Sequence, residues 1–177
     1  MSTHMLRKIT LIAAIGLLFT AIGIYFGLKH FEPGRPADLA VSALMQTTLS
    51  DAQDKQHPLS EWQGKLLLVN FWATWCPPCV AEMPELVSLQ ADMADKNLQI
   101  IGIGIDSPTN IRQFSEKYKI SYPLLVAGLS GTELARSFGN EAGGLPFTVL
   151  ISPDGHIKQV YIGRLDMAKV RADLASL

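Results

Sequence analysis

The chain contains two cysteines, Cys76 and Cys79, and both lie in the segment Trp75-Cys76-Pro77-Pro78-Cys79. An apolar run over residues 66–72 precedes them and a stretch with helical periodicity follows, which predicts a strand, a turn and a helix beginning near Cys76. Residues three apart on a first helical turn share one side, close enough for a disulfide. The free N–H groups and partial positive charge of a helix N-terminus favour a thiolate. This spacing therefore predicts a centre for reversible thiol–disulfide exchange.

Three other kinds of site also use paired cysteines. A zinc site would need a second pair of ligands, but no third cysteine exists and the four histidines stand singly, at His4, His30, His57 and His156. Covalent haem attachment needs a histidine after the second cysteine, where Val80 stands. A permanent structural disulfide would close so short a loop that it would constrain the unfolded chain little. We therefore expect redox chemistry, with no metal and no cofactor beyond the Cys76–Cys79 disulfide.

The N-terminus indicates where this chemistry takes place. Residues 9–28 carry no charge, and they follow Arg7-Lys8 and precede Lys29-His30. The run is long enough to cross a bilayer as a helix and longer than the apolar core of about 7–15 residues in signal peptides. We predict a cytoplasmic tail over residues 1–8 and an uncleaved transmembrane anchor over 9–28 in the inner (cytoplasmic) membrane. The catalytic domain would lie on the periplasmic side, where disulfide chemistry is normal.

The rest of the chain is predicted to form a linker and one globular domain. Glu32-Pro33-Gly34-Arg35-Pro36 resists helix formation, so residues 29–42 are interpreted as a linker. Residues 43–177 suit a single domain. The formal net charge of −1 and the lack of a basic block away from the anchor argue against a nucleic-acid partner.

Hydrophobic patterns predict the elements of this domain as follows. Residues 43–59 would hold two short strands around a polar turn, followed by a helical turn at 60–62. Strands are expected at 66–72, 98–105, 122–126, 148–151 and 157–162, and helices at 77–94, 108–119, 132–138 and 166–175. This order indicates a mixed sheet with helices on both faces.

Two segments carry a resemblance to a known family. The run Val69-Asn70-Phe71-Trp72-Ala73-Thr74-Trp75-Cys76-Pro77-Pro78-Cys79, with Glu82, Pro84 and Leu86 after it, resembles the membrane-anchored, extracytoplasmic branch of the thioredoxin superfamily. That branch holds the TlpA, ResA and CcmG (DsbE) proteins. Gly144-Leu145-Pro146 resembles the cis-proline loop of the superfamily. The resemblance implies a thioredoxin-like α/β fold, in which a mixed central sheet is flanked by helices, with an extra N-terminal β-hairpin and one N-terminal transmembrane helix.

The resemblance also implies a role for each matching residue. Cys76 would be the exposed attacking cysteine and Cys79 the buried resolving one. Glu82 would take and return the proton of Cys79, with its pKa raised by desolvation. Pro146 would be cis and face the disulfide, and the backbone of Leu145 would bind a substrate chain.

Four further residues complete these expectations. Trp75 and Pro77 are assigned to the docking surface for substrates. Asn70 replaces the buried acid of cytoplasmic thioredoxin and cannot itself accept a proton. Phe147 stands where the cytochrome c maturation branch tends to carry an acid, so the resemblance leaves the substrate open.

The leading hypothesis is a membrane-tethered oxidoreductase that reduces disulfides in exported proteins, such as proteins of cytochrome c maturation or copper-site cysteines. A membrane electron donor of the DsbD or CcdA kind would regenerate the dithiol. One alternative is a disulfide-donating oxidase, although Pro77-Pro78 lacks the histidine that strong oxidants often carry between their cysteines. A copper-binding assembly factor is a third reading, since Cys76 and Cys79 are soft ligands. A peroxidase would need a threonine-proline loop that the sequence lacks.

Overall fold

The computed structural model describes residue 13, residues 15–25 and residues 36–177, in two units that divide between residues 34 and 35. In the first unit, residues 15–25 are helical. Within the described residues, no helix is both long enough and apolar enough to span a bilayer. The predicted anchor over 9–28 has both ends outside those residues, so it stays a prediction.

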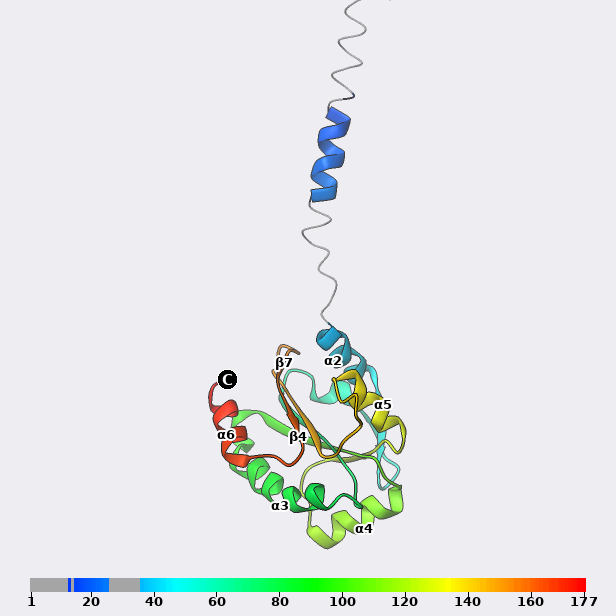
Figure 1. Ribbon diagram of the computed structural model, residues 1–177, viewed down its shortest axis with the longest axis vertical. Helices are drawn as coiled ribbons and strands as arrows, with labels where there is room; N and C mark the ends of the chain where they lie inside the picture. The colour runs from blue at the N-terminus through cyan, green and yellow to red at the C-terminus, as the bar shows by residue number, and fades with distance from the viewer. Residues whose placement is uncertain (1–12, 14, 26–35) are drawn as a thin grey trace, which may run out of the picture. The chain divides into compact units, whose positions relative to one another are not determined.

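The second unit is an α/β domain built on one seven-stranded sheet (Figure 1). Its strands are β1 (Thr48–Asp51), β2 (Gln56–Pro58), β3 (Leu66–Trp72), β4 (Leu98–Gly104), β5 (Leu124–Val126), β6 (Phe147–Ile151) and β7 (Ile157–Ile162). Its α-helices are α2 (Pro36–Gln46), α3 (Pro77–Asp92), α4 (Pro108–Tyr118), α5 (Ser130–Ser137) and α6 (Met167–Ala175). Two 3-10 turns, η1 (Leu59–Trp62) and η2 (Ala94–Lys96), complete the unit.

The sheet is mixed, as the sequence predicts. Its strand order is β2-β1-β5-β4-β3-β6-β7. Strands β3, β4 and β5 are parallel, whereas β6 and β7 at one edge and β1 and β2 at the other are antiparallel to their neighbours. The β1–β2 pair is the predicted N-terminal hairpin, which adds two strands beyond β5.

Every side chain of strand β3 is buried, because the strand has a neighbour on each side and a core on each face. Leu68 and Trp72 face a core formed with α3, α4 and α6. Val69 and Phe71 face a second core formed with α2, η1 and α5. Alternation along a strand sends neighbouring residues to opposite faces, so Asn70, between Val69 and Phe71, lies on the α3 face.

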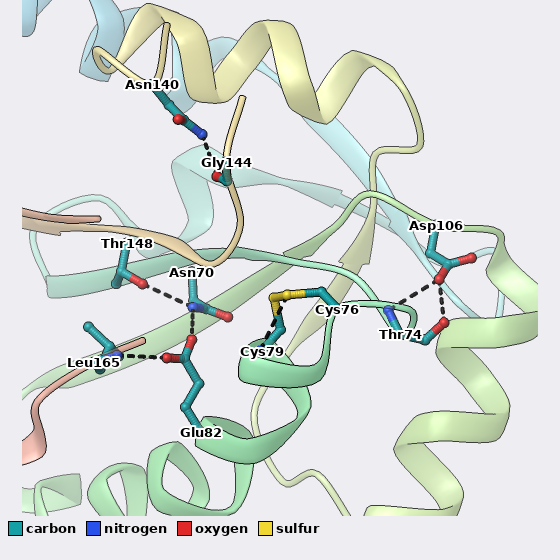
Figure 2. Close-up of a disulfide and its surroundings, with 10 residues drawn as sticks. All are labelled: Asn70, Thr74, Cys76, Cys79, Glu82, Asp106, Asn140, Gly144, Thr148 and Leu165. Carbon is teal, nitrogen blue, oxygen red and sulfur yellow. Dashed lines mark hydrogen bonds between the residues drawn. A yellow bond between two sulfur atoms is a disulfide. The ribbon is translucent and has the colours of Figure 1, made fainter. Parts of the chain in front are cut away.

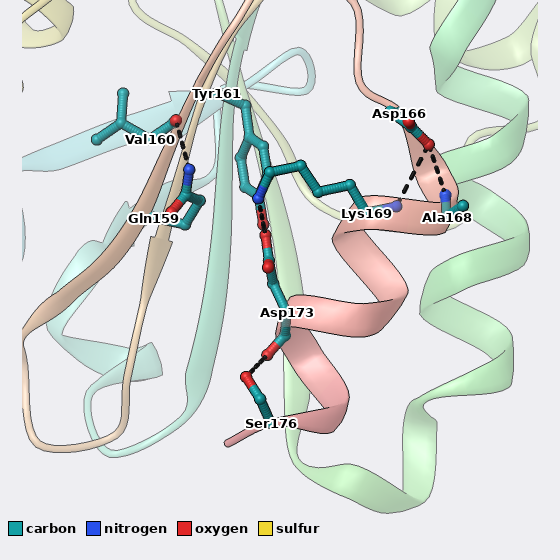
Figure 3. Close-up of polar contacts among 8 residues, drawn as sticks. All are labelled: Gln159, Val160, Tyr161, Asp166, Ala168, Lys169, Asp173 and Ser176. Carbon is teal, nitrogen blue, oxygen red and sulfur yellow. Dashed lines mark hydrogen bonds and ion pairs between the residues drawn. The ribbon is translucent and has the colours of Figure 1, made fainter.

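Helix α6 and the loop before it are fastened to the sheet edge by a small polar cluster (Figure 3). Tyr161 on β7 donates its hydroxyl hydrogen to Asp173 Oδ2 at 2.7 Å, and Lys169 Nζ reaches the same oxygen at 2.7 Å. Asp166 caps the helix by accepting from the N–H groups of Ala168 and Lys169. The Tyr161–Asp173 hydrogen bond holds α6 against β7, the edge strand of the sheet.

Two predictions about this domain are wrong. Residues 36–42 are not linker and residues 43–46 are not strand, because α2 covers both segments. This helix buries Ala40, Val41 and Leu44, spaced to form an apolar stripe, against the second core.

Candidate active site

The two cysteines form a disulfide at the N-terminus of α3 (Figure 2). Cys76 is the N-cap residue, and its Sγ accepts a hydrogen bond from the backbone N–H of Cys79 at 3.3 Å. Pro77 occupies the first helical turn, where the missing N–H of proline costs no hydrogen bond. Cys76 keeps 5% of its surface exposed and Cys79 none, so only Cys76 can meet an incoming substrate.

The loop before Cys76 is braced by an acid from the end of the neighbouring strand. Asp106 Oδ2 accepts hydrogen bonds from the backbone N–H of Thr74, at 3.2 Å, and from the Thr74 hydroxyl. Its other oxygen accepts from Ser107 N and Asn110 Nδ2, each at 2.7 Å. Burial raises the pKa of Asp106, but these hydrogen bonds outweigh burial and hold it below its usual value. The ionised acid therefore ties the loop that carries the cysteines to β4 and α4.

The second predicted segment reaches the same end of the sheet. Pro146 is preceded by a cis peptide bond, as predicted. In the β3–β6 register Phe71 lies opposite Phe147, which places Pro146 level with the end of β3 that leads to the cysteines. Asn140 Nδ2 donates to Gly144 O at 2.9 Å and Gly163 N–H donates to Pro146 O at 2.9 Å, so the loop is held from both sides.

Glu82 is the acid nearest in sequence to the cysteines, three residues after Cys79, and it is fully buried. Its Oε1 accepts a hydrogen bond from Asn70 Nδ2 at 2.8 Å, and its Oε2 accepts one from the backbone N–H of Leu165 at 2.9 Å. Asn70 Nδ2 gives its second hydrogen to Thr148 Oγ1 at 2.9 Å. The carboxyl group that α3 carries is thus held by hydrogen bonds from β3 and from the loop before α6 (Figure 2).

Burial raises the pKa of Glu82, and the hydrogen bonds from Leu165 and Asn70 only partly oppose that effect. This agrees with the direction expected from the sequence. An acid with a raised pKa takes up and releases a proton more readily near neutral pH than an exposed glutamate does. The shift therefore has the direction that the predicted role of Glu82 in proton transfer requires, and the role itself stays a prediction.

The three predicted docking residues differ in exposure. Trp75 is 65% exposed and Pro77 is exposed, whereas Leu145 is half-buried. Trp72, by contrast, is fully buried and packs on Phe114 with ring centroids 4.8 Å apart. Trp75 and Pro77, which flank Cys76 in the sequence, therefore present apolar surface that includes one large aromatic ring.

Sequence reasoning missed three partners in this site, namely Thr148, Asp106 and the backbone of Leu165. Thr148 lies directly opposite Asn70 in the β3–β6 register, and both interrupt otherwise apolar strands. The sequence shows one polar residue in each of these two otherwise apolar strands. Because buried polar groups form hydrogen bonds, this pattern could have predicted that Asn70 and Thr148 are partners. The bond from Leu165 has no such signal, since any residue can donate a backbone N–H.

Comparisons with known proteins agree with this geometry. The model of the AhpC/TSA family matches residues 41–160. The thiol-disulfide oxidoreductase ResA of Geobacillus thermodenitrificans is 28% identical over 162 residues, which cover 91% of this chain and 90% of that protein.

Two solved structures share the fold. A thiol:disulfide interchange protein of the thioredoxin family from Chlorobium tepidum has a TM-score of 0.63 and 27% identity, over 73% of this chain and 91% of that chain. A secreted Mycobacterium tuberculosis disulfide oxidoreductase homologous to E. coli DsbE has a TM-score of 0.64 at 21% identity, over 76% of this chain and 98% of that chain.

Proposed function

We propose that this protein reduces disulfides in exported proteins. The chain belongs to the AhpC/TSA family and is a thiol–disulfide oxidoreductase of the ResA and DsbE type. The resemblance to the TlpA, ResA and CcmG branch is confirmed. The direction of electron flow, the membrane anchor and the choice of substrate are the proposed parts.

The reaction begins with the dithiol form. The Cys76 thiolate attacks one sulfur of a substrate disulfide, and the other substrate sulfur leaves as a thiolate that water protonates. Cys79 then gives its proton toward Glu82 and attacks Cys76 Sγ, which forms the Cys76–Cys79 disulfide and releases the second substrate thiol. Two electrons pass from the protein to the substrate, and a dithiol donor must return them.

The surroundings of Cys76 carry the proposal that the protein is a reductant. Its Sγ receives a hydrogen bond from the N–H of Cys79, and the two residues between the cysteines are prolines, which offer no charge and no N–H. Strong oxidants owe their high potential to extra stabilisation of the reduced form. A thiolate stabilised mainly by the helix N-terminus favours a lower potential.

The proposed setting follows from the sequence. Residues 9–28 would anchor the protein in the lipid bilayer of the inner membrane and leave residues 36–177 on the periplasmic side. The substrates would be disulfide-containing exported proteins, for example apocytochrome c or proteins with copper-site cysteines. A membrane protein of the DsbD or CcdA kind would supply electrons.

Trapping tests this function directly. Cys79→Ser in the full-length protein cannot resolve the mixed disulfide, so exported substrates should accumulate on Cys76 in cells, whereas the matched variant Cys76→Ser should capture none. Equilibration with glutathione or dithiothreitol buffers should give a potential near or below about −220 mV. A value near about −120 mV would identify an oxidase instead, and equal capture by both variants would refute the proposed chemistry.

A further inference from the structure

Asn70 presents a buried hydrogen-bond acceptor to the redox centre. The residue is fully buried, and both hydrogens of its Nδ2 are donated, one to Glu82 Oε1 and one to Thr148 Oγ1. These two bonds fix the orientation of the amide. Oδ1 receives no hydrogen bond from any residue that the structure describes, and it points toward the disulfide (Figure 2).

The chemistry of the disulfide explains an acceptor in this position. Disulfide sulfurs carry no hydrogen and can donate nothing to Oδ1. Reduction by a dithiol adds two electrons and two protons, which break the S–S bond and give two thiols, while the dithiol itself becomes a disulfide. One of the new thiols belongs to Cys79, which is fully buried, so any acceptor for its weak S–H donor must come from the protein itself.

We propose that Asn70 Oδ1 accepts the S–H hydrogen of Cys79 in the reduced protein. Asn70 is then a positioning residue that senses the redox state, because its acceptor is satisfied in the dithiol and unsatisfied in the disulfide. Through Nδ2 the same amide holds the Glu82 carboxyl group. The buried thiol, the amide and the acid thus form one hydrogen-bonded line in the reduced state.

The arrangement favours reduction. An unsatisfied buried acceptor is unfavourable, whereas an acceptor that receives a hydrogen bond is not. The amide therefore stabilises the dithiol relative to the disulfide, and removing it should make the disulfide harder to reduce. This inference rests on the thiol–disulfide couple of the oxidoreductase and holds whichever way electrons flow in the cell.

A vibrational measurement tests the hydrogen bond itself. The full-length Cys76→Ser protein has Cys79 as its single thiol, so the S–H stretching band in its infrared spectrum belongs to Cys79 alone. A thiol that donates a hydrogen bond absorbs at lower frequency than a free one. Adding Asn70→Leu should move the band to higher frequency, whereas adding Thr148→Val, which keeps Oδ1, should leave it in place. A band at the same frequency with and without the Asn70 amide would overturn the proposal.

The reduction potential gives a second readout on proteins with both cysteines. Asn70→Leu should lower the equilibrium constant for reduction about tenfold, a potential about 30 mV more negative, and Thr148→Val should change it less. If Asn70→Leu does not fold, the S–H stretching frequency of the Cys76→Ser protein by itself tests the proposal. A frequency equal to that of a free thiol would refute the hydrogen bond. Absence of a reversible couple in the wild-type protein would refute the function, whereas a normal couple that Asn70→Leu leaves unchanged refutes only the role of Asn70.

Discussion

Replacing Glu82 by glutamine should slow the step in which Cys79 acts. The glutamine side chain fills nearly the same space but cannot take a proton from the Cys79 thiol. It also matches the site poorly, because the two oxygens of Glu82 accept from Asn70 Nδ2 and from Leu165 N. The amide nitrogen of glutamine would face one of these donors, which costs about 1–3 kcal/mol, partly offset because no charge is buried. Loss of general-base assistance predicts a drop of about 100-fold or more in this step.

Ellman's reagent, an aromatic disulfide, separates the two steps in one reaction. Attack by Cys76 releases the first coloured thiolate, and attack by Cys79 on the mixed disulfide releases the second. In Glu82→Gln, the rate of the first release should stay within about threefold of the wild-type rate, whereas the second release should be slower. The wild-type rate of the second release should rise with pH through the pKa of Glu82, which burial raises above its ordinary 4.5, and the variant should lose that rise.

The matched control lies three residues along the same helix. Glu85→Gln changes an exposed carboxylate that pairs with Arg164 at 2.8 Å, so both releases should proceed at wild-type rates. The reasoning would be refuted by a second release in Glu82→Gln with the wild-type rate and pH profile. It would be refuted equally if Glu85→Gln slowed that step as much.

Three further outcomes follow from the packing and the charges. Leu44→Ala should lower the free energy of unfolding by about 2–5 kcal/mol in denaturant titrations, because Leu44 is fully buried, whereas Leu39→Ala, 62% exposed, should stay within about 0.5 kcal/mol. Asp106→Ala should lower the free energy of unfolding by about 1–3 kcal/mol and speed amide hydrogen exchange at Thr74, whose N–H loses its acceptor. An unchanged exchange rate at Thr74 would contradict the proposed support of this loop by Asp106. Burial lowers the pKa of His57, but hydrogen bonds to Glu61 and Asp51 outweigh burial and raise the pKa above 6.5. The free energy of unfolding that this pair of bonds contributes is therefore present below about pH 6.5 and should be lost as pH rises through the raised pKa. Denaturant titrations of His57→Gln should show no such loss.

The sequence allowed most of the sheet to be predicted because its central strands carry strong local signals. The run 66–72 is apolar except for Asn70, and Ser152-Pro153-Asp154-Gly155 marks the turn between β6 and β7. Cys76, Cys79 and Pro146 were found from motifs whose chemistry needs those residue types. The structure places them at one end of the sheet, and their roles in the reaction stay predictions for the experiments above.

The parts that sequence reasoning did not find depend on contacts between distant segments. Helix α2 begins at Pro36, just after Pro33 and Gly34. Its short apolar stripe at Ala40, Val41 and Leu44 can be recognised only when the second face of the sheet is seen to need a covering helix. Asn70 was interpreted only as a lost acid. Its two donated hydrogens become visible when Thr148, 78 residues away, and Glu82 are placed beside it.

Phe147 shows how the structure changes the meaning of a motif position. It follows Pro146 directly, where the resemblance suggests a residue that helps to select substrates. Its side chain is fully buried in the second core, with ring centroids 6.0 Å from Phe71, on the face of the sheet away from α3. An acid at this position would have to be buried without a partner, which is strongly unfavourable. We therefore expect substrate selection to depend on accessible residues near Cys76 in the predicted site, above all the exposed ring of Trp75 and the backbone of Leu145.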